Sequence, residues 1–337
     1  MKITKKVIAL GLAALTMSVG LAGCGGSSSA SEGSSSGNSA AEGKVYNIGI
    51  CQLVQHDALD AATKGFRDTL EEKLGKDNVK FDEQNAQGDS ATCTTICNSF
   101  ITSNYDLILG NGTAALQAAY TGTQDIPILG TSITHYGTAL DITDWKGYTG
   151  TNVSGTSDLA PLEDQAKMLN ELFPDVKNVG ILYCSAEANS KYQADTITPF
   201  FEDAGYTVKS YTFSDTNDVA AVTQTACDES DVLYIPTDNT AASNTGIIDN
   251  IALPSKTPII AGEEGICSGC GVATLSISYY EIGQKTGEMA YDILVNGADI
   301  STMEIEFAPN VTKKYDAERC EALGIKIPEG YEAISAE

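Results

Sequence analysis

From residue 44 onward, short β-rich segments alternate with stretches of helical periodicity. Residues 45–50 read Val-Tyr-Asn-Ile-Gly-Ile, and apolar residues at helical spacing follow from Leu59 to Leu74. We expect further strands at residues 79–82, 106–110 and 126–130, and helices at residues 91–103 and 113–120. This alternation is typical of βαβ units built around parallel sheets.

The same order recurs later in the chain. Residues 176–181 repeat the pattern of residues 45–50 after 131 residues, and residues 231–242 echo residues 106–115 after 125. We predict an α/β fold of two Rossmann-like lobes with parallel sheets, joined by a multi-strand hinge. A strand at 271–276, a helix at 279–295, a segment at 305–307 and a helix at 317–323 complete the chain. The expected lobes are residues 44–152 with 279–304 and residues 153–278 with 305–337.

The N-terminus has the features of a secretory signal. Lys2, Lys5 and Lys6 precede an apolar stretch at 7–19, and Leu-Ala-Gly-Cys24 follows. This order predicts a lipoprotein signal peptide at 1–23 and acylation of Cys24; the alternative is an ordinary signal peptide with a chance cysteine. Residues 24–43 form a Gly/Ser tether that reaches roughly 25 Å. The predicted location is the extracytoplasmic face of the cell membrane, by a lipid anchor.

Charge narrows the range of partners. Removing the three lysines of the signal segment takes the formal charge from −25 to −28, so nucleic acid is an unfavourable partner. The chain has only two arginines, Arg67 and Arg319, which disfavours a ligand that needs a bidentate arginine clamp.

Eight cysteines follow Cys24, and the sequence leaves their state open. Cys93 and Cys97 share a helical face, and Cys267-Ser-Gly-Cys270 has the spacing of a redox or zinc half-site. The alternatives are buried free thiols, a disulfide, or a metal site.

Ligands of such folds bind where parallel strands end and helices begin. Candidates after the first-lobe strands are Gln52, His56, Asn111, Gly112, Thr113, Ala114, Thr131 and Ser132. Asp57 and Thr113 are alternatively helix N-caps. Candidates in the second lobe are Glu187, Asn189, Asp238, Asn239 and Glu263. Asp238 and Asn239 alternatively cap the helix near Ala241. Hydroxyls and amides on one wall and carboxylates on the other suit a zwitterion that favours closure.

Several motifs in order carry a family likeness. They are Gln52-x-x-x-His56-x-Ala-Leu-Asp, Asn85-Ala-Gln-Gly-Asp89, Gly150-Thr-Asn-Val-Ser-Gly-Thr-Ser-Asp158, Glu187-x-Asn-Ser, Pro236-x-Asp-Asn and Tyr279-Tyr-x-x-Gly283. Over about residues 44–331 the chain resembles tryptophan-binding-type substrate-binding proteins of ABC transporters. The resemblance implies a type I periplasmic-binding-protein fold that closes over an amino acid, often aromatic. It adds Ser157 and Asp158 to the residues expected in the cleft. Two segments depart from the family: Gly112-Thr-Ala-Ala115, and Ile133-Thr-His-Tyr136 near the expected pocket.

We therefore predict a monomeric binding lipoprotein, not an enzyme, that needs no metal or cofactor and works with a membrane permease and its ATPase. The expected ligand is an aromatic or hydrophobic amino acid, with Tyr136, Tyr183 or Tyr192 able to stack on a ring. Alternatives are a receptor for a nucleoside, vitamin or peptide, a surface hydrolase, or a structural surface protein. A hydrolase is disfavoured because no Gly-x-Ser-x-Gly motif joins a predicted strand to a predicted helix.

Overall fold

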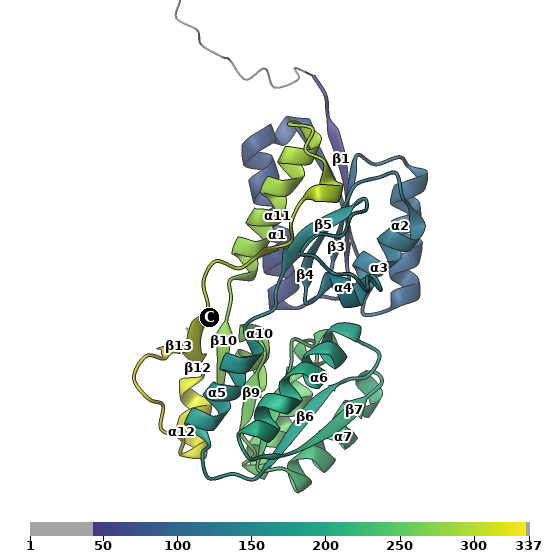
Figure 1. Ribbon diagram of the computed structural model, residues 1–337. Coiled ribbons are helices and arrows are strands. Elements are labelled where there is room, and N and C mark those ends of the chain that lie inside the picture. Colours follow the sequence, from purple (N-terminus) through teal and green to yellow (C-terminus); the bar gives the residue numbers. More distant parts are fainter. Residues whose placement is uncertain (1–42, 335–337) are drawn as a thin grey trace, which may run out of the picture. The chain divides into compact units, whose positions relative to one another are not determined.

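The computed structural model describes residues 43–334, which form two sheets covered by helices (Figure 1). The strand orders are β11-β5-β4-β3-β1-β2 in the first sheet and β13-β12-β10-β9-β8-β6-β7 in the second. All pairings are parallel except that of β10 with β12. The predicted α/β class with two parallel-sheet lobes is confirmed.

The inner strands of the first sheet are buried on both faces, and β3 and the first half of β4 accordingly read as apolar runs. In β3, Leu107 and Leu109 face helices α1 and α11, whereas Ile108 packs with α2 and α3 on the opposite face. The strands are β1 (Tyr46–Gln52), β2 (Val79–Asn85), β3 (Leu107–Asn111), β4 (Ile128–Ile133), β5 (Val153–Ser157) and β11 (Glu306–Phe307). The helical segments are α1 (Asp57–Leu74), η1 (Lys76–Asn78), α2 (Ser90–Thr102), α3 (Thr113–Gly122), α4 (Tyr136–Ala139), α11 (Tyr279–Leu294) and η2 (Ile300–Thr302).

Glycines allow α11 to pack directly against α1, although the two helices are far apart in sequence (Figure 1). A Cβ on Gly65 would lie 2.1 Å from the carbonyl oxygen of Tyr280, and one on Gly283 would lie 2.1 Å from that of Ala62. The chain thus returns from the second sheet to complete the first lobe with α11.

The second sheet is covered in the same way. Helices α5 and α6 pack on one face with Ile181 and Tyr234, and α7, α9 and α10 pack on the other with Leu182 and Leu233. The strands are β6 (Asn178–Cys184), β7 (Thr207–Phe213), β8 (Val232–Ile235), β9 (Ile259–Ala261), β10 (Ala273–Ser276), β12 (Thr312–Tyr315) and β13 (Glu332–Ala333). The helices are α5 (Leu162–Leu172), α6 (Ala188–Asp203), α7 (Thr216–Glu229), α8 (Asn239–Ala242), α9 (Thr245–Ser255), α10 (Glu264–Cys270) and α12 (Ala317–Leu323).

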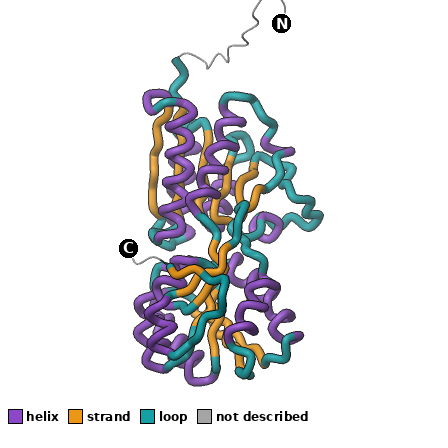
Figure 2. The backbone as a smooth tube through the Cα atoms, turned by 90° about the vertical axis from the view of Figure 1, so that its left-hand side faces the viewer, coloured by secondary structure: helices purple, strands orange, loops and turns teal. Residues whose placement is uncertain are grey.

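The internal repeat corresponds to equivalent strands. Residues 45–50 and their repeat at 176–181 form β1 and β6. Residues 106–115 and their repeat at 231–242 contain β3 and β8. In the first sheet β1 lies beside β3, and in the second sheet β6 lies beside β8 at the equivalent position. In both lobes the strands lie between helices (Figure 2). The repeat therefore reflects one architecture used twice.

The predicted lobe boundaries need correction at two strands. Residues 153–157 and 306–307 were assigned to the second lobe, but β5 pairs with β4 and β11 pairs with β5 in the first sheet. The chain crosses to the second sheet only after Ser157, returns between β10 and α11, and crosses again between β11 and β12. These three crossings correspond to the expected multi-strand hinge.

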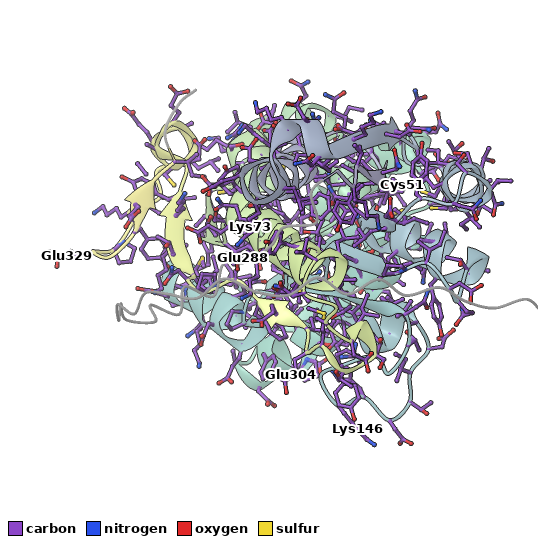
Figure 3. The ribbon with its side chains drawn as sticks, turned by 90° about the horizontal axis from the view of Figure 1, so that it is seen from above. Cys51, Lys73, Lys146, Glu288, Glu304 and Glu329 are labelled. Carbon is purple, nitrogen blue, oxygen red and sulfur yellow. The ribbon has the colours of Figure 1, made fainter. Side chains whose placement is uncertain are left out.

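The eight cysteines of the described residues are free and buried. Cys51 lies inside the first lobe, whereas Lys146 and Glu329 project at the periphery (Figure 3). Burial raises the pKa of the Cys184, Cys227 and Cys320 thiols, which keeps them protonated. Within residues 43–334 no group of three or more His, Cys, Asp or Glu side chains is arranged to hold a metal ion.

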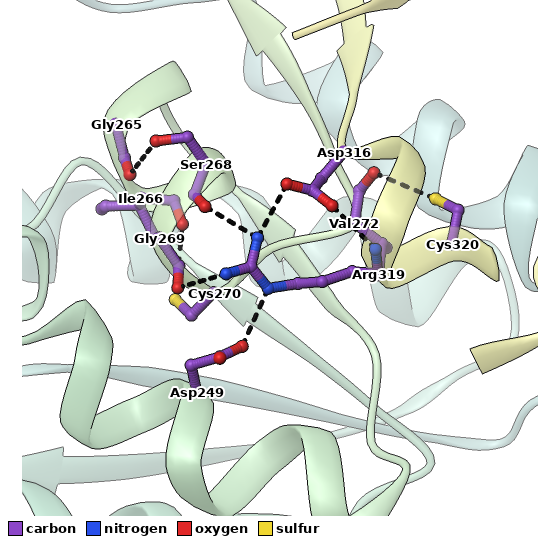
Figure 4. A network of polar contacts seen from close by, with 10 residues as sticks. All are labelled: Asp249, Gly265, Ile266, Ser268, Gly269, Cys270, Val272, Asp316, Arg319 and Cys320. Atoms are coloured by element: carbon purple, nitrogen blue, oxygen red, sulfur yellow. Dashed lines mark hydrogen bonds and ion pairs between the residues drawn. The ribbon is translucent and has the colours of Figure 1, made fainter. Parts of the chain in front are cut away.

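Arg319 of α12 connects this helix to α10, which contains Cys267 and Cys270 (Figure 4). Its guanidinium donates to Asp249 and Asp316, each at 2.8 Å, and to the carbonyl oxygens of Ser268 and Gly269, each at 2.7 Å. This arginine is therefore engaged inside the second lobe, where four of its five N–H donors have partners.

Cys24 and most of the Gly/Ser tether lie outside the described residues. Among the helices that are described, none combines the length and apolar character needed to cross a bilayer.

Candidate functional site

The carboxyl ends of the first-sheet strands carry a chain of buried hydrogen bonds. Gln52, at the end of β1, donates to Asp60 at 2.6 Å and to the carbonyl oxygen of Val54 at 3.0 Å. Its Oε1 accepts from Thr63 at 2.7 Å, and the Thr63 hydroxyl accepts from Asn111 Nδ2 at 2.9 Å. Gln52 thus fixes the loop that leads into α1, and its polar atoms are engaged within the first lobe.

Two side-chain oxygens at this edge are buried and lack a partner among the described residues: Asn111 Oδ1 and Ser132 Oγ. Their strands are neighbours, since Asn111 pairs with Thr131 across β3 and β4. Ser132 has a φ of +57°, in the left-handed region that costs energy for a residue other than glycine. A strained backbone that presents a buried, unpaired hydroxyl points to a binding site rather than to a packing role.

Helix α3 begins directly after this edge. Its N-cap is Gly112, with a φ of +95° and no side chain to satisfy the first amides. Thr113 is the first helical residue, so the alternative interpretation of Thr113 as an N-cap was wrong. The same holds for Asp57, because His56 occupies the N-cap position of α1. Backbone amides of Thr113 and Ala114 lie at the positive end of the α3 dipole, where a carboxylate binds favourably.

The second-lobe edge is different because its carboxylates already accept hydrogen bonds. Glu187 accepts from both nitrogens of Asn239, at 3.0 and 2.7 Å, and from the amide and hydroxyl of Thr240, each at 2.8 Å. Asn189 donates to Glu187 at 3.1 Å and to the carbonyl oxygen of Thr237 at 2.9 Å. Glu187 therefore caps α8 from a distance.

Asp238 and Glu263 are buried helix caps. Asp238 accepts from the amide of Ala241 at 2.7 Å and from that of Cys184 at 2.6 Å, and burial with the nearby Glu187 charge raises its pKa to about 8. Glu263 accepts from the amides of Gly265, at 2.6 Å, and Ile266, and burial raises its pKa to about 7. The capping interpretation of Asp238 is thus what the structure shows.

Asp158 lies where the chain leaves the first sheet. It accepts from Thr134 at 3.2 Å and from the Tyr279 hydroxyl at 3.1 Å, and burial raises its pKa to about 6. Tyr279 begins α11, so this contact ties two of the three crossings together. The preceding Ser157 donates to the carbonyl oxygen of Thr134 at 2.9 Å, which makes Ser157 a support for the same junction.

Four contacts link the facing edges, and one of them joins the Thr134 and Thr237 hydroxyls, whose oxygens lie 3.4 Å apart. His56 Nε2 lies 3.3 Å from Asn239 Oδ1, and burial lowers the pKa of His56. Gln193 Nε2 donates to Thr134 at 3.1 Å and also to Thr237 of its own lobe. The rings of His135 and Tyr192 stack with centroids 4.6 Å apart.

Gln193 and Thr237 were not among the predicted site residues. Gln193 lies inside α6, where no loop or strand end marks it, and only its 1% exposed fraction reveals a buried amide. Thr237 stands between Pro236 and Asp238 in a motif that the sequence did single out, so its position offered a signal. Of the three tyrosines proposed as stacking partners, Tyr136 and Tyr183 are buried in the lobes, and Tyr192 contacts the other lobe.

The structure has two hollows near these residues. A narrow one, with no room for a water molecule, is lined by Thr113, His135, Thr138, Ala139, Ala188, Asn189 and Tyr192. A larger one of about 1420 Å³ is lined mainly by α1, α10, α12 and the crossings, and it shares only Glu263 with the predicted site. The narrow hollow is lined by Thr113 at the start of α3 and by the predicted site residue Asn189 of the second lobe, so we place the candidate site there.

A sequence model described as ABC transporter substrate binding protein matches residues 47–336. The chain belongs to this family. The family consists of binding proteins rather than enzymes; its members take up a small molecule outside the cytoplasm and work with an ABC transporter.

Relatives of known ligand or structure match most of this chain. The chain is 36% identical over 335 residues to a tyrosine-binding protein of Clostridioides difficile, covering 96% of each chain. It is 30% identical to a Streptococcus pneumoniae ABC domain solved in complex with L-Trp, with a TM-score of 0.82 over 86% of this chain and 100% of the other. A ligand-free, open substrate-binding protein from Clostridium difficile is 36% identical, with a TM-score of 0.66 over 87% and 100%.

The structure is more similar to the L-Trp complex than to the open protein, although the open protein is closer in sequence. This agrees with the four contacts between the facing edges, which opening of the lobes would break. Type I periplasmic binding proteins that carry sugars share the fold at much lower identity, for example a glucose-galactose binding protein of Geobacillus stearothermophilus at 12% and a TM-score of 0.57.

Proposed function

We propose that this chain captures a free aromatic amino acid between its lobes and delivers it to an ABC importer. The observation that carries the proposal is the pair of buried, unpartnered oxygens at the first-lobe edge, Asn111 Oδ1 and Ser132 Oγ, close in the sheet to the start of α3. The tyrosine-binding relative and the L-Trp-bound relative support the choice of an aromatic ligand.

The charged groups of an amino acid match the hydrogen-bonding atoms that are unpaired at this edge. The ammonium group donates to Asn111 Oδ1, and the α-carboxylate accepts from the Ser132 hydroxyl and the amides of Thr113 and Ala114. The ring lies toward His135 and Tyr192, which line the narrow hollow together with Thr113. Burial of unpaired polar atoms is costly, so a ligand that pairs them gains affinity that an apolar molecule does not.

The remaining predicted residues act by support. Gln52, Thr131, Ser157 and Asp158 hold the first-lobe loops and the crossings, and Glu187, Asn189, Asp238, Asn239 and Glu263 hold the second-lobe loops. His56 contacts Asn239 across the interface. Each of these residues holds a loop in the closed arrangement, and its own polar atoms do not bind the ligand.

A calorimetric titration of residues 44–337 tests the proposal. We expect L-tyrosine, L-phenylalanine or L-tryptophan to bind, with stabilisation by about 2.7 kcal/mol at a hundred times Kd. Tyramine lacks the carboxylate, and 3-(4-hydroxyphenyl)propionate lacks the ammonium, so both are expected to bind at least tenfold more weakly than L-tyrosine. Equal binding of tyramine, or binding only of nucleosides, vitamins or peptides, would refute the assignment.

We also propose that Cys24 is acylated and holds a monomer at the outer face of the membrane. The Leu-Ala-Gly-Cys order and the Gly/Ser tether support this. The full chain is expected to partition into detergent and a Cys24→Ala variant into the aqueous phase. Equal partition of the two variants would exclude the anchor.

A further inference from the structure

We propose that His135 and Tyr192 form an aromatic clasp that closes the mouth of the ligand space and slows ligand release. His135 precedes α4 of the first lobe, and Tyr192 belongs to α6 of the second. Their rings are nearly parallel, with centroids 4.6 Å apart and an interplanar angle of 4°. Because the rings come from different lobes, separation of the lobes must break the stack. The proposal rests on the proposed function for the identity of the ligand, but not for the existence of the clasp.

The first-lobe half of the clasp is held in place. His135 Nδ1 accepts from the Thr138 amide at 3.1 Å and lies 2.9 Å from the Thr138 hydroxyl. A nitrogen that accepts from an amide carries no proton, so the imidazole is neutral with its proton on Nε2. Burial also lowers the pKa of His135. A neutral ring stacks on a phenol without the cost of burying a charge.

Trp145 supports the other side of the imidazole. Its ring meets His135 edge-on at 5.5 Å and stacks on the buried Tyr136 at 6.5 Å. The stack thus runs from the first-lobe core through Trp145 and His135 to Tyr192. Tyr192 is half-buried, and it has no such backing within its own lobe among the described aromatic pairs. The His135 ring therefore has an aromatic support in its own lobe that the Tyr192 ring does not have among the described pairs.

The clasp adjoins the candidate ligand site. The narrow hollow beside it is lined by both rings together with Thr113 of the first lobe and Asn189 of the second. A ligand that reaches the start of α3 therefore lies next to the stack. Closing the stack blocks the exit, and opening it is needed for both entry and release.

Two substitutions remove the stack with little disturbance elsewhere. Tyr192→Ala removes one ring, and His135→Asn removes the other while keeping an N-cap side chain for α4. Tyr192→Phe keeps the ring and serves as the control. In stopped-flow experiments with L-tyrosine, we expect the dissociation rate to rise roughly three- to tenfold in each single variant. The double variant is expected to match the singles, because each change removes the same contact.

Rates that stay at the wild-type value in both single variants, or that multiply in the double variant, would overturn the clasp. Trp145 is the only tryptophan of the chain, which gives a second readout that needs no ligand. Acrylamide is expected to quench Trp145 fluorescence more in Tyr192→Ala than in Tyr192→Phe; equal quenching would also overturn it. If the wild-type chain binds no aromatic amino acid, the proposed function fails, and the quenching result alone decides the clasp.

Discussion

The two edges that face each other differ in how their polar atoms are used. At the first-lobe edge, Asn111 Oδ1 and Ser132 Oγ are buried without a partner, and Gly112 leaves the start of α3 uncapped by a side chain. At the second-lobe edge, Asp238 and Glu263 are buried carboxylates that each accept two backbone amides.

The difference separates two tasks that the sequence did not distinguish. The second-lobe carboxylates stabilise the loops in which they lie, so their oxygens serve folding. The first-lobe edge keeps hydrogen-bonding capacity that folding leaves unused, which carries an energetic cost in the ligand-free state. A ligand that pairs these atoms removes that energetic cost. Substitutions at the second-lobe edge are therefore expected to change stability, and substitutions at the first-lobe edge to change affinity.

The largest expected effect follows from removing a second-edge cap. Asp238→Ala leaves the buried amides of Cys184 and Ala241 without an acceptor, and we expect a loss of about 3 kcal/mol in the free energy of unfolding. Asp215→Ala is the matched control, because Asp215 is an exposed cap of α7 in the same lobe; it is expected to cost about 1 kcal/mol. Urea denaturation measures both, and equal losses would remove the distinction between a buried and an exposed cap.

A pH effect should also originate from the second edge and the crossings. Burial raises the pKa of Asp238 to about 8, of Glu263 to about 7 and of Asp158 to about 6. The folded state therefore holds more protons than the unfolded state between about pH 4 and pH 8, and its stability falls as pH rises through that window. We expect the free energy of unfolding to be higher at pH 5.5 than at pH 8, with Asp238 as the largest contributor because its pKa is raised the most.

Glu263→Gln supplies the control for this pH dependence. The amide keeps one acceptor for the α10 cap but does not titrate, so the change in stability between pH 8 and pH 5.5 should be smaller than in the wild type. Thermal unfolding followed across pH measures the slope. A wild-type stability that rises with pH over this window would show that these carboxyl groups are ionised at no cost.

The fold was predictable because its signals are local and repeated. The apolar runs of β3 and β8 and the helical spacing of α1 depend on sequence alone, and β1, α3 and α12 begin or end within two residues of the predicted bounds. The boundary at Val153 was wrong because β5 differs from a second-lobe strand only in its pairing with β4. Pairing between distant strands leaves no mark in a single sequence.

The candidate site was predictable in position but not in role. Strand ends identified Asn111, Ser132 and Asp238 correctly as edge residues. Whether a polar side chain is free to bind a ligand depends on which donors and acceptors the folded loops place next to it. Glu187, for example, accepts from four groups of Asn239 and Thr240. Gln193 was missed because it reaches the interface from the middle of a helix.

At the first edge we expect a change in affinity with little change in stability. Ser132→Ala removes a hydroxyl that has no partner among the described residues, so the free energy of unfolding should stay within about 0.5 kcal/mol. The affinity for the aromatic amino acid is expected to fall about tenfold, which corresponds to 1.4 kcal/mol. Calorimetry and urea denaturation on the same variant measure the two quantities.

Thr223→Val is the matched control for Ser132→Ala. Thr223 also carries a buried hydroxyl without a partner in the described chain, but it lies in α7 and packs away from the facing edges. Removing it should leave ligand affinity unchanged. If both variants bind as the wild type does, the unpaired hydroxyl at the first edge has no role in recognition.

The smallest effect is expected where the two edges touch. His56 meets Asn239 at 3.3 Å, and as N-cap of α1 its side chain makes no capping bond, so His56→Ala removes one long contact between the lobes. Such a contact contributes to the closed arrangement only, and we expect a two- to threefold loss of affinity, about 0.5 kcal/mol, with the stability of each lobe unchanged. The pKa of His56 is lowered by burial, so the side chain is neutral near pH 7, and the loss should not depend on salt. A loss of affinity as large as that of Ser132→Ala would mean that His56 contacts the ligand itself. The contact between the two edges would then belong to the binding site, and ligand binding would not be confined to the unpaired atoms of the first-lobe edge.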